Sequence, residues 1–295
     1  CIRDSPDRRR FNVPQLIDLA LSSIKDFLKE KIVIEKADGE WFFSLAEVRK
    51  WDIGIEEKVK ELLAMSAPIV NISEDEIEEK LRRNGRPEYV SEERYEEAIA
   101  EQTRAVKAAL RHSICVITGP AGTGKTTVVR TIIDVLKEQK PDFDMLLVAP
   151  TGKATVRLRE LTGRDTMTIH RFLAQNRAFD FKFFRLKPTQ APQGFDLVVI
   201  DEASMVNTEL LWAFFNSIKT ERLVVVGDPN QLPPVEAGKP FQNLIKYFKR
   251  KRPEAVACLT EILRISSQEV FPLLETLREG KALPQEISED LNRQK

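Results

Sequence analysis

The sequence predicts an α/β fold in which helices cover both faces of a parallel β-sheet. Five short apolar runs have the length of buried strands, and longer stretches with helical spacing separate them. Each run ends in polar residues, and the carboxyl edge of a parallel sheet is where such folds bind ligands. The five runs are residues 113–118, 145–150, 195–204, 222–228 and 256–262.

Composition and charge narrow the class of protein. Of the 295 residues, 42% are hydrophobic and 31% are charged, which excludes disorder along the whole chain. No stretch approaches the ~20 consecutive apolar residues of a membrane span, and the first residues lack the apolar core of an export signal. The three cysteines are scattered, which favours a reducing compartment. We therefore expect a cytoplasmic protein without membrane association.

The first part of the chain, residues 1–90, is expected to form a small accessory module of helices and a hairpin. Its outline is winged-helix-like, and it could contact DNA or a partner, or only support the domain that follows. A charged stretch with a break near residues 84–90 is the expected linker. The expected elements are a helix at 14–29, a hairpin turning at Asp38-Gly39 and a helix at 44–65 with an interruption near Gly54.

A glycine-rich loop follows the first apolar run and predicts a nucleotide-binding site. Gly119 to Thr126 spell GPAGTGKT, which matches G-x-x-x-x-G-K-[ST] between a strand and a helix. Glycines let backbone N–H groups close around phosphates, and the helix N-terminus favours negative charge. Lys125 is expected to reach the β- and γ-phosphates, and the Thr126 hydroxyl to ligate Mg²⁺. The expected nucleotide-binding residues of the loop are Gly119, Pro120, Ala121, Gly122, Thr123, Gly124, Lys125, Thr126 and Thr127.

A carboxylate pair, Asp201-Glu202, ends the third apolar run and predicts hydrolysis. Asp201 is expected to help hold the Mg²⁺ ion, and Glu202 to polarise a water for attack on the γ-phosphate. Gln231, after the fourth run, has the chemistry to contact the γ-phosphate. The alternatives are helix N-terminal carboxylates for the pair and an exposed loop amide for Gln231.

Together these motifs resemble those of superfamily one DNA helicases of the RecD type. The resemblance covers about residues 100–270 and, more weakly, 30–70. It implies a RecA-like domain, here placed at 91–280, that uses ATP and Mg²⁺. Gln102 sits where that family keeps a glutamine that reads adenine, and Arg264 where it keeps a γ-phosphate-binding arginine. Pif-type helicases share much of the pattern. The matching runs are GPAGTGKT (119–126), APTGKAT (149–155), TIHRFL (168–173), VVIDEASMV (198–206) and GDPNQLPPVEAG (227–238).

The chain departs from this family in its length after the motifs. About thirty residues follow Arg264, too few for a second RecA-like domain of roughly 100 residues or more. We therefore expect residues 281–295 to be a tail that leads to a missing second motor domain, whose arginine finger is typically worth about 10³–10⁵ in turnover.

The resemblance also implies DNA contacts. Thr151, Lys153 and His170 match strand-contacting motifs, although Thr151 and Lys153 could instead belong to a helix-capping segment and His170 could be a capping histidine. Residues 176–194 alternate with a strand period and predict a short hairpin insertion. Its Lys182, Arg185 and Lys187 are the expected cationic contacts, while its phenylalanines could stack bases or be buried against the core. Because the chain has 46 basic and 46 acidic residues, any DNA-binding groove must be local.

The expected function is the ATP-binding and ATP-hydrolysing half of a RecD-like DNA helicase with a role in DNA repair and recombination. The resemblance implies 5′ to 3′ translocation on single-stranded DNA, unwinding at a duplex junction, and helicase–nuclease partner subunits. Two alternatives stay open at this point. One is a DNA-binding or assembly subunit with a regulatory nucleotide site, and the other is a different P-loop ATPase, such as a Pif-type helicase or a loader.

Overall fold

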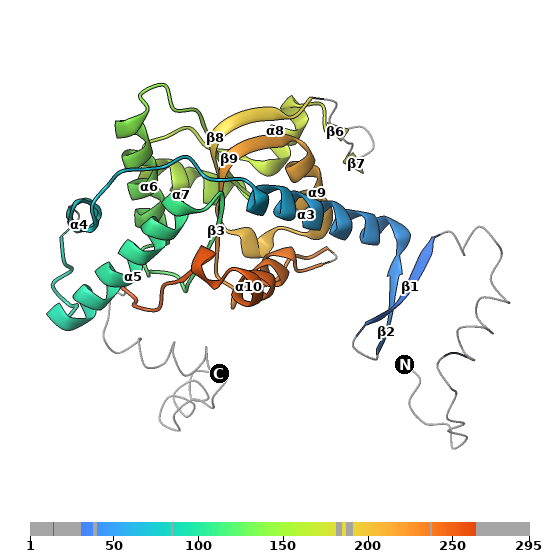
Figure 1. Ribbon diagram of the computed structural model, residues 1–295, viewed down its shortest axis with the longest axis horizontal. Coiled ribbons are helices and arrows are strands. Elements are labelled where there is room, and N and C mark those ends of the chain that lie inside the picture. Colours follow the sequence, from blue (N-terminus) through green and yellow to red (C-terminus); the bar gives the residue numbers. More distant parts are fainter. Residues whose placement is uncertain are drawn as a thin grey trace, which may run out of the picture. The chain divides into compact units, whose positions relative to one another are not determined.

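The computed structural model describes residues 14, 31–37, 40–83, 85–180, 185–186, 191–236 and 238–263. The chain divides into two compact units, Cys1–Gly54 and Ile55–Lys295, which we describe separately (Figure 1). The finer division predicted from the sequence, with limits at residues 90 and 280, stays a prediction. None of the described helices is both long enough and apolar enough to cross a membrane.

In the first unit, an antiparallel hairpin pairs β1 (Ile32–Ala37) with β2 (Glu40–Leu45). Ala37 lies opposite Glu40, so the chain turns at the Asp38-Gly39 position that the sequence indicates. Helix α3 (Ala46–Ala64) starts directly after β2. The interruption expected near Gly54 is wrong, because a single glycine inside a long helix costs only about 1 kcal/mol relative to alanine. The helix expected at 14–29 lies outside the described residues.

The second unit contains a six-stranded sheet in which every neighbouring pair is parallel. The strand order is β10-β3-β9-β8-β4-β5. Five of these strands coincide with the apolar runs of the sequence, and β5 is the addition. The strands are β3 (Ile114–Thr118), β4 (Met145–Ala149), β5 (Met167–Thr168), β8 (Gln193–Ile200), β9 (Ile218–Gly227) and β10 (Val256–Cys258).

Helices cover both faces of this sheet, because alternate residues of one strand point to opposite sides. Ile114 and Val116 of β3 belong to one hydrophobic cluster, and Cys115 and Ile117 belong to the other. Figure 1 shows α5, α6 and α7 on one side and α8, α9 and α10 on the other. The helices are α4 (Glu74–Arg82), α5 (Glu92–Arg111), α6 (Lys125–Gln139), α7 (Gly152–Thr162), α8 (Ile169–Gln175), α9 (Thr208–Asn216) and α10 (Pro240–Lys251).

The strand order brings three polar segments to the carboxyl edge of the sheet. Strand β9 lies between β3 and β8, so the glycine loop after β3, Asp201 after β8 and Asp228 after β9 share this edge. The N–H of Gly119 donates to the carbonyl of Gly227 at 3.3 Å, which ties the start of the loop to β9. The α/β fold predicted from the sequence is confirmed.

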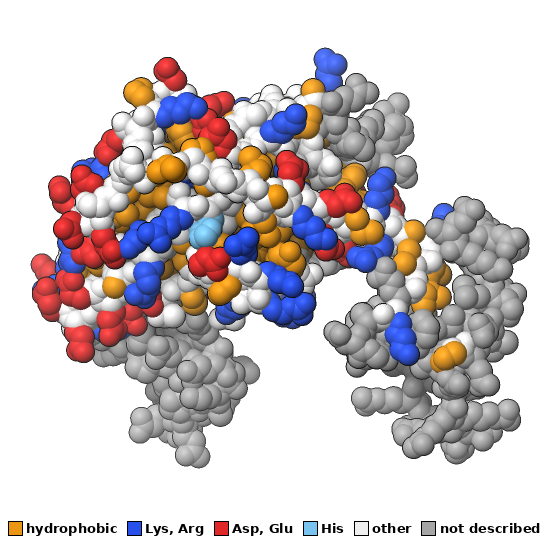
Figure 2. All heavy atoms as spheres, in the orientation of Figure 1, with side chains coloured by type: hydrophobic (Ala, Val, Ile, Leu, Met, Phe, Trp, Pro, Cys, Tyr) orange, Lys and Arg blue, Asp and Glu red, His pale blue; other side chains and the backbone are white. Residues whose placement is uncertain are grey.

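Charged side chains of both signs lie over the surface of this unit (Figure 2). Acidic side chains gather over α4 and α5, whose first turns are acidic. Basic side chains gather near α10, whose last turn contains Lys249, Arg250 and Lys251. This face is therefore mixed in charge, as the net charge of zero implies.

Candidate nucleotide-binding site

The glycine loop between β3 and α6 has a backbone that only glycine fits well. Gly122 and Gly124 have φ angles of 90° and 85°, in the left-handed region that other residues rarely adopt. A Cβ atom at Gly124 would collide with the amide nitrogen of Gln102, and one at Gly119 would lie 2.5 Å from the carbonyl oxygen of Leu259. The loop is therefore packed tightly on α5 and on the segment after β10.

Lys125, the first residue of α6, points back into the loop. Its Nζ donates to the carbonyl oxygens of Gly119 and Pro120, each at 2.8 Å. Burial lowers the pKa of Lys125, and the carboxylates of Asp228, Glu202 and Asp201 oppose this shift. An anionic ligand in the loop would offset the cost of keeping this ammonium charged, as a phosphate does.

Asp201 follows the last residue of β8 and is ionised only with difficulty. Burial and then the neighbouring Glu202 carboxylate raise the pKa of Asp201 to about 6, against the opposing effects of Lys125 and Arg157. Its Oδ1 accepts a hydrogen bond from the Glu202 N–H at 2.9 Å. A bound cation would compete with the proton at this carboxyl group.

Glu202 is strained in its backbone and lacks a partner for its side chain. Its φ of 52° is one of two positive φ values among the described non-glycine residues. Its Oε2 is buried without a hydrogen-bond partner. Such backbone strain costs on the order of 1–3 kcal/mol and clusters at functional sites, and a buried carboxylate oxygen without a donor adds to this cost. The carboxylate is thus ready to accept a hydrogen bond from a ligand or a water.

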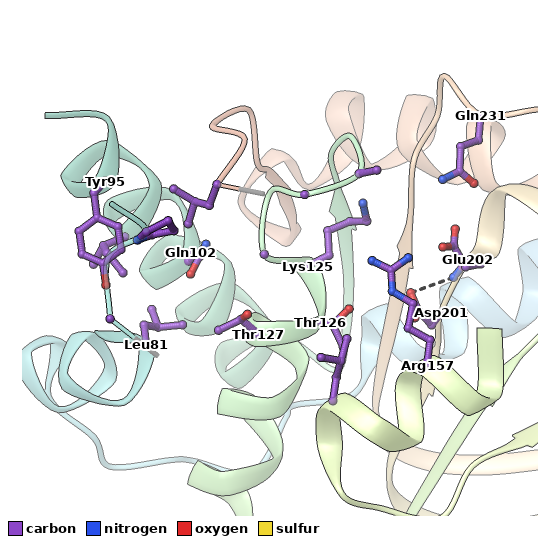
Figure 3. A pocket seen from close by; sticks show the side chains of 18 residues that line it. Leu81, Tyr95, Gln102, Lys125, Thr126, Thr127, Arg157, Asp201, Glu202 and Gln231 are labelled. Carbon is purple, nitrogen blue, oxygen red and sulfur yellow. Dashed lines mark hydrogen bonds between the residues drawn. The ribbon is translucent and has the colours of Figure 1, made fainter. Parts of the chain in front are cut away.

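Gln231 reaches the same site from the loop after β9. Its Oε1 accepts from the Ser204 hydroxyl at 3.4 Å, and its backbone N–H donates to the carbonyl of Asp228 at 3.1 Å. The Oδ1 of Asp228 accepts from the Asn230 N–H at 2.9 Å. These bonds form a tight turn that brings the Gln231 side chain over the two carboxylates (Figure 3).

A cavity of about 290 Å³ joins these groups. One end, the phosphate end, is lined by the glycine loop, Thr126, Thr127 and the polar side chains of Arg157, Asp201, Glu202 and Gln231. The other end is lined mainly by apolar side chains and by Gln102. No group of three or more potential ligands from His, Cys, Asp and Glu occurs in the described part of the chain. A Mg²⁺ ion held by Thr126 and Asp201 would therefore complete its coordination with phosphate and water oxygens.

Sequence reasoning did not identify Arg157, which lines the phosphate end from α7. In Figure 3 its guanidinium points toward Asp201 and Lys125, and its charge lowers the pKa of both groups. No motif marked this position, because Arg157 lies two residues beyond the APTGKAT run (149–155).

Three of the residues expected to contact DNA, Thr151, Lys153 and His170, do not line this cavity. The Thr151 hydroxyl accepts from the Ala154 N–H at 3.3 Å and caps α7, and Lys153 is exposed in the first turn of that helix. His170 lines a separate cavity with Thr168 and Arg171. Burial lowers the pKa of His170, against the opposing effect of Glu236. Their roles in binding DNA stay predictions.

Within residues 176–194 the structure has a short antiparallel hairpin of β6 (Phe179–Asp180) and β7 (Arg185–Leu186). Lys182 and Lys187 lie outside the described residues, and for Arg185 only the backbone is described. Arg264, the expected γ-phosphate-binding arginine, also lies outside them.

The parallel sheet, the glycine loop and the carboxylate pair at one edge define a P-loop nucleotide-binding protein of the α/β class. Residues 97–294, about two thirds of the chain, match the AAA domain family model, and the chain belongs to this family.

Several known proteins are similar to the chain, including helicases of the RecD type, which confirms the resemblance seen in the motifs. A RecD subunit of the RecBCD enzyme from Mycolicibacterium smegmatis is 36% identical over 168 residues, 50% of this chain and 30% of that protein. The ATP-dependent RecD2 DNA helicase of Deinococcus radiodurans is 37% identical over 142 residues, 48% and 19% of the two chains. An uncharacterized protein of Methanocaldococcus jannaschii is 34% identical over 276 residues, 86% and 24% of the two chains.

The chain thus spans between a fifth and a third of the length of these relatives. Among solved structures, the Pif1 helicase of Candida albicans is 26% identical with a TM-score of 0.43, covering 65% of this chain and 46% of that one. A Bacteroides Pif1 bound to single-stranded DNA is 23% identical with a TM-score of 0.39, covering 60% and 45%.

Proposed function

We propose that the chain is the ATP-binding and ATP-hydrolysing part of a RecD-like DNA helicase. The observation that carries this proposal is the phosphate end of the cavity, where a partly buried lysine, two adjacent carboxylates and a glutamine converge. Three features of this end fit a Mg²⁺–nucleotide complex. Gly119 and Gly124 leave no room for side chains, Lys125 is a partly buried cation, and the Glu202 carboxylate has an oxygen without a donor.

The residues divide into binding and hydrolysing groups. The loop N–H groups and Lys125 bind the phosphates, and the Thr126 hydroxyl and Asp201 hold the cation, which when bound neutralises the phosphate charge. Glu202 accepts a proton from the attacking water. Gln231 contacts the γ-phosphate, and Arg157 adds a positive charge on the same side of the site.

The DNA substrate and the partners follow from the relatives. The chain is 32–37% identical to RecD and RecD2 proteins over about half of its length or more, which supports single-stranded DNA and a duplex junction as substrates. Translocation from 5′ to 3′, a second motor domain, helicase–nuclease partner subunits and a cytoplasmic location belong to the same proposal. In it, Arg264 binds the γ-phosphate.

Turnover by the 295-residue chain tests this proposal. The chain alone should bind Mg²⁺–ATP but hydrolyse it slowly, because this proposal assigns the arginine finger, typically worth about 10³–10⁵ in turnover, to a second domain outside these 295 residues. The full-length protein should hydrolyse ATP rapidly when single-stranded DNA is added. Turnover of about 1–100 s⁻¹ by a verified monomer of the chain would contradict the half-motor assignment. A full-length protein that binds ATP but shows no DNA-stimulated hydrolysis would instead indicate a regulatory nucleotide site.

A further inference from the structure

Helix α10 carries a row of cations that the nucleotide site does not use. Residues 239–252, which include this helix, contain six lysines and arginines and no carboxylate, although the whole chain has 46 basic and 46 acidic residues. All six side chains are exposed, and none of them lines the nucleotide-binding cavity. Figure 2 shows basic side chains gathered near this helix. The six cations are Lys239, Lys246, Lys249, Arg250, Lys251 and Arg252.

The helix runs from the carboxyl edge of the sheet toward the amino edge. At its start, the ring of Phe241 packs against Gly227, the last residue of β9. The Gln242 amide donates to the carbonyl of Pro229 at 3.2 Å. The end of the helix is followed within a few residues by the start of β10. Because an α-helix rises about 1.5 Å per residue, its 12 residues span about 18 Å. The last turn of α10 therefore lies away from the turn that carries Gln231.

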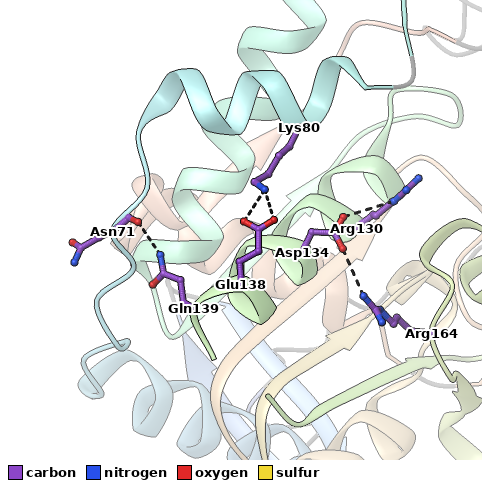
Figure 4. A network of polar contacts seen from close by, with 7 residues as sticks. All are labelled: Asn71, Lys80, Arg130, Asp134, Glu138, Gln139 and Arg164. Atoms are coloured by element: carbon purple, nitrogen blue, oxygen red, sulfur yellow. Dashed lines mark hydrogen bonds and ion pairs between the residues drawn. The ribbon is translucent and has the colours of Figure 1, made fainter. Parts of the chain in front are cut away.

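Most cations of α10 lack the carboxylate partners that cations on the other face of the sheet have. On that face, Lys80 donates to both carboxylate oxygens of Glu138, at 2.5 and 2.7 Å (Figure 4). Just after α10, Arg252 lies 3.6 Å from the carboxylate of Glu254. The cations of the helix that form no ion pair with any described residue are Lys246, Lys249, Arg250 and Lys251. Their charges are thus available to an anionic partner.

The spacing of these cations is unfavourable for the helix by itself. Lys246 precedes Lys249 by three residues and Arg250 by four, so the three side chains share one face. Like charges at these spacings destabilise a helix. The negative end of the helix dipole favours cations in the last turn, which contains Lys249, Arg250 and Lys251, but it does not explain Lys246. An anion bound to this face would remove the repulsion.

The chemistry of this face fits a phosphate backbone better than a protein or a single strand. None of the large apolar side chains that are exposed among the described residues lies in residues 239–252, whereas the cores of protein interfaces are rich in aromatic side chains and poor in lysine. Sites for single strands add aromatic rings on which bases stack. The one partly exposed aromatic side chain of α10, Tyr247, packs on the hydrophobic cluster with its ring centre 5.8 Å from that of Phe248.

We propose that the face of α10 formed by Lys246, Lys249 and Arg250 binds the phosphate backbone of duplex DNA. Duplex DNA carries one phosphate charge per about 1.7 Å of its axis, so a rigid row of cations meets several phosphates at once. Contacts to phosphates carry no sequence information, so this site is independent of base sequence. The choice of DNA as the polyanion rests on the proposed function. The site itself is separate from the nucleotide cavity and from the single-strand contacts proposed after β4 and β5.

Fluorescence anisotropy of the 295-residue chain, with a blunt duplex and with a single strand of the same length, tests this surface. Changing Lys246, Lys249 and Arg250 together to alanine should weaken duplex binding on the order of tenfold. It should also reduce the log–log salt slope by about 0.9 for each phosphate that is no longer neutralised. The affinities for the single strand and for Mg²⁺–ATP should stay the same. Because all three side chains are exposed, the variant should fold like the wild type.

Two variants control for net charge and for fold. Changing Arg83, Arg104 and Arg130 together to alanine removes the same charge from exposed positions on or beside α4, α5 and α6. This variant should bind the duplex like the wild type. A second variant that exchanges lysine and arginine at the three α10 positions keeps the charge and should also bind like the wild type. A parallel titration with polyglutamate replaces the phosphates by carboxylates.

The outcomes separate this inference from the proposed function. A wild-type chain that does not bind the duplex, or an alanine variant of α10 with unchanged duplex affinity and salt slope, would overturn the inference. Equal weakening in the control variant, or equal weakening of duplex and single strand, would overturn it too. An α10 variant that loses polyglutamate but keeps the duplex would assign the surface to an acidic polypeptide instead. A wild-type chain that binds no Mg²⁺–ATP would overturn the proposed function, which the duplex titration does not measure.

Discussion

Two aspartates, one inside strand β8 and one just past it, are in opposite situations. Asp196 lies in the middle of β8 but beside the amino end of β4, and it accepts hydrogen bonds from Lys140 at 2.5 Å and from the Asp144 N–H at 2.8 Å. Although burial raises the pKa of Asp196, these bonds lower it overall. Just past the carboxyl end, burial raises the pKa of Asp201 to about 6, and Glu202 is strained and lacks a donor. The contacts of Asp196 thus stabilise the fold. At the carboxyl edge of the sheet, Asp201 and Glu202 destabilise it, and this arrangement leaves them able to bind a ligand.

Matched substitutions should show this difference most strongly. The folded pKa of Asp201 lies above its unfolded value, so its ionisation destabilises the fold increasingly as the pH rises, and fully above about 6. Asp201→Asn should therefore raise the free energy of unfolding at pH 8 by up to about 3 kcal/mol, at roughly 1.4 kcal/mol per pKa unit. The gain should shrink as the pH falls toward 4, where the folded state is protonated.

Asp196→Asn, beside the amino end of β4, is the control, and its effect on the free energy of unfolding should have the opposite sign. Its ionised form stabilises the fold above the unfolded pKa of about 3.9, so the variant should be less stable at pH 8. Urea unfolding followed by circular dichroism at pH 8 and pH 5 measures the free energy of unfolding of both variants. A destabilised Asp201→Asn variant at pH 8 would contradict the contrast between the two edges.

A smaller effect is expected from Arg157, the cation that sequence reasoning missed. Arg157→Ala should weaken Mg²⁺–ATP binding about tenfold, because the phosphates are deprived of one charged hydrogen-bond donor, and Arg157→Lys should retain part of the affinity. Arg104→Ala, which removes an exposed arginine from α5 outside the cavity, should change nothing. Equal affinities for all three variants would place Arg157 outside the nucleotide-binding residues.

The smallest expected change is in DNA binding, and the substitutions that test it lie outside both edges of the sheet. Changing Lys182, Arg185 and Lys187 together to alanine should weaken binding of single-stranded DNA and flatten its salt dependence, by about 0.7 in log–log slope for each phosphate that the variant no longer neutralises. The affinity for ATP should stay the same. Fluorescence anisotropy at several salt concentrations measures this, and an unaltered slope would leave Thr151, Lys153 and His170 as the remaining candidates.

The phosphate end could be predicted from the sequence because its residues form short continuous motifs. GPAGTGKT and Asp201-Glu202 each follow an apolar run directly, and parallel strands bring their carboxyl ends to one edge. The apolar end of the cavity could not be predicted in this way. Leu81 and Leu263 are far apart in the chain and line the same cavity only in the folded protein, and neither carries a distinctive side chain.

The elements of the fold also divide into those that the sequence predicts and those that it does not. Five strands were evident as apolar runs, whereas β5 has two residues, too few to give a periodic signal. The glycine at position 54 suggested a break, but the helical residues on both sides of it continue α3. Local breakers are weak evidence when the surrounding pattern is long and periodic.

The central claim is that different residues of one cavity bind the phosphates and hydrolyse the nucleotide. Nucleotide binding by two variants tests this claim. In a titration with a fluorescent ATP analogue, Lys125→Ala should weaken binding on the order of 100-fold, because the phosphates no longer have this charged hydrogen-bonding partner. Lys137→Ala, at the far end of the same helix, should bind like the wild type. Glu202→Gln should keep nearly full affinity and, in the full-length protein, lose hydrolysis. Equal loss of binding in Lys125→Ala and Glu202→Gln would contradict this division of roles.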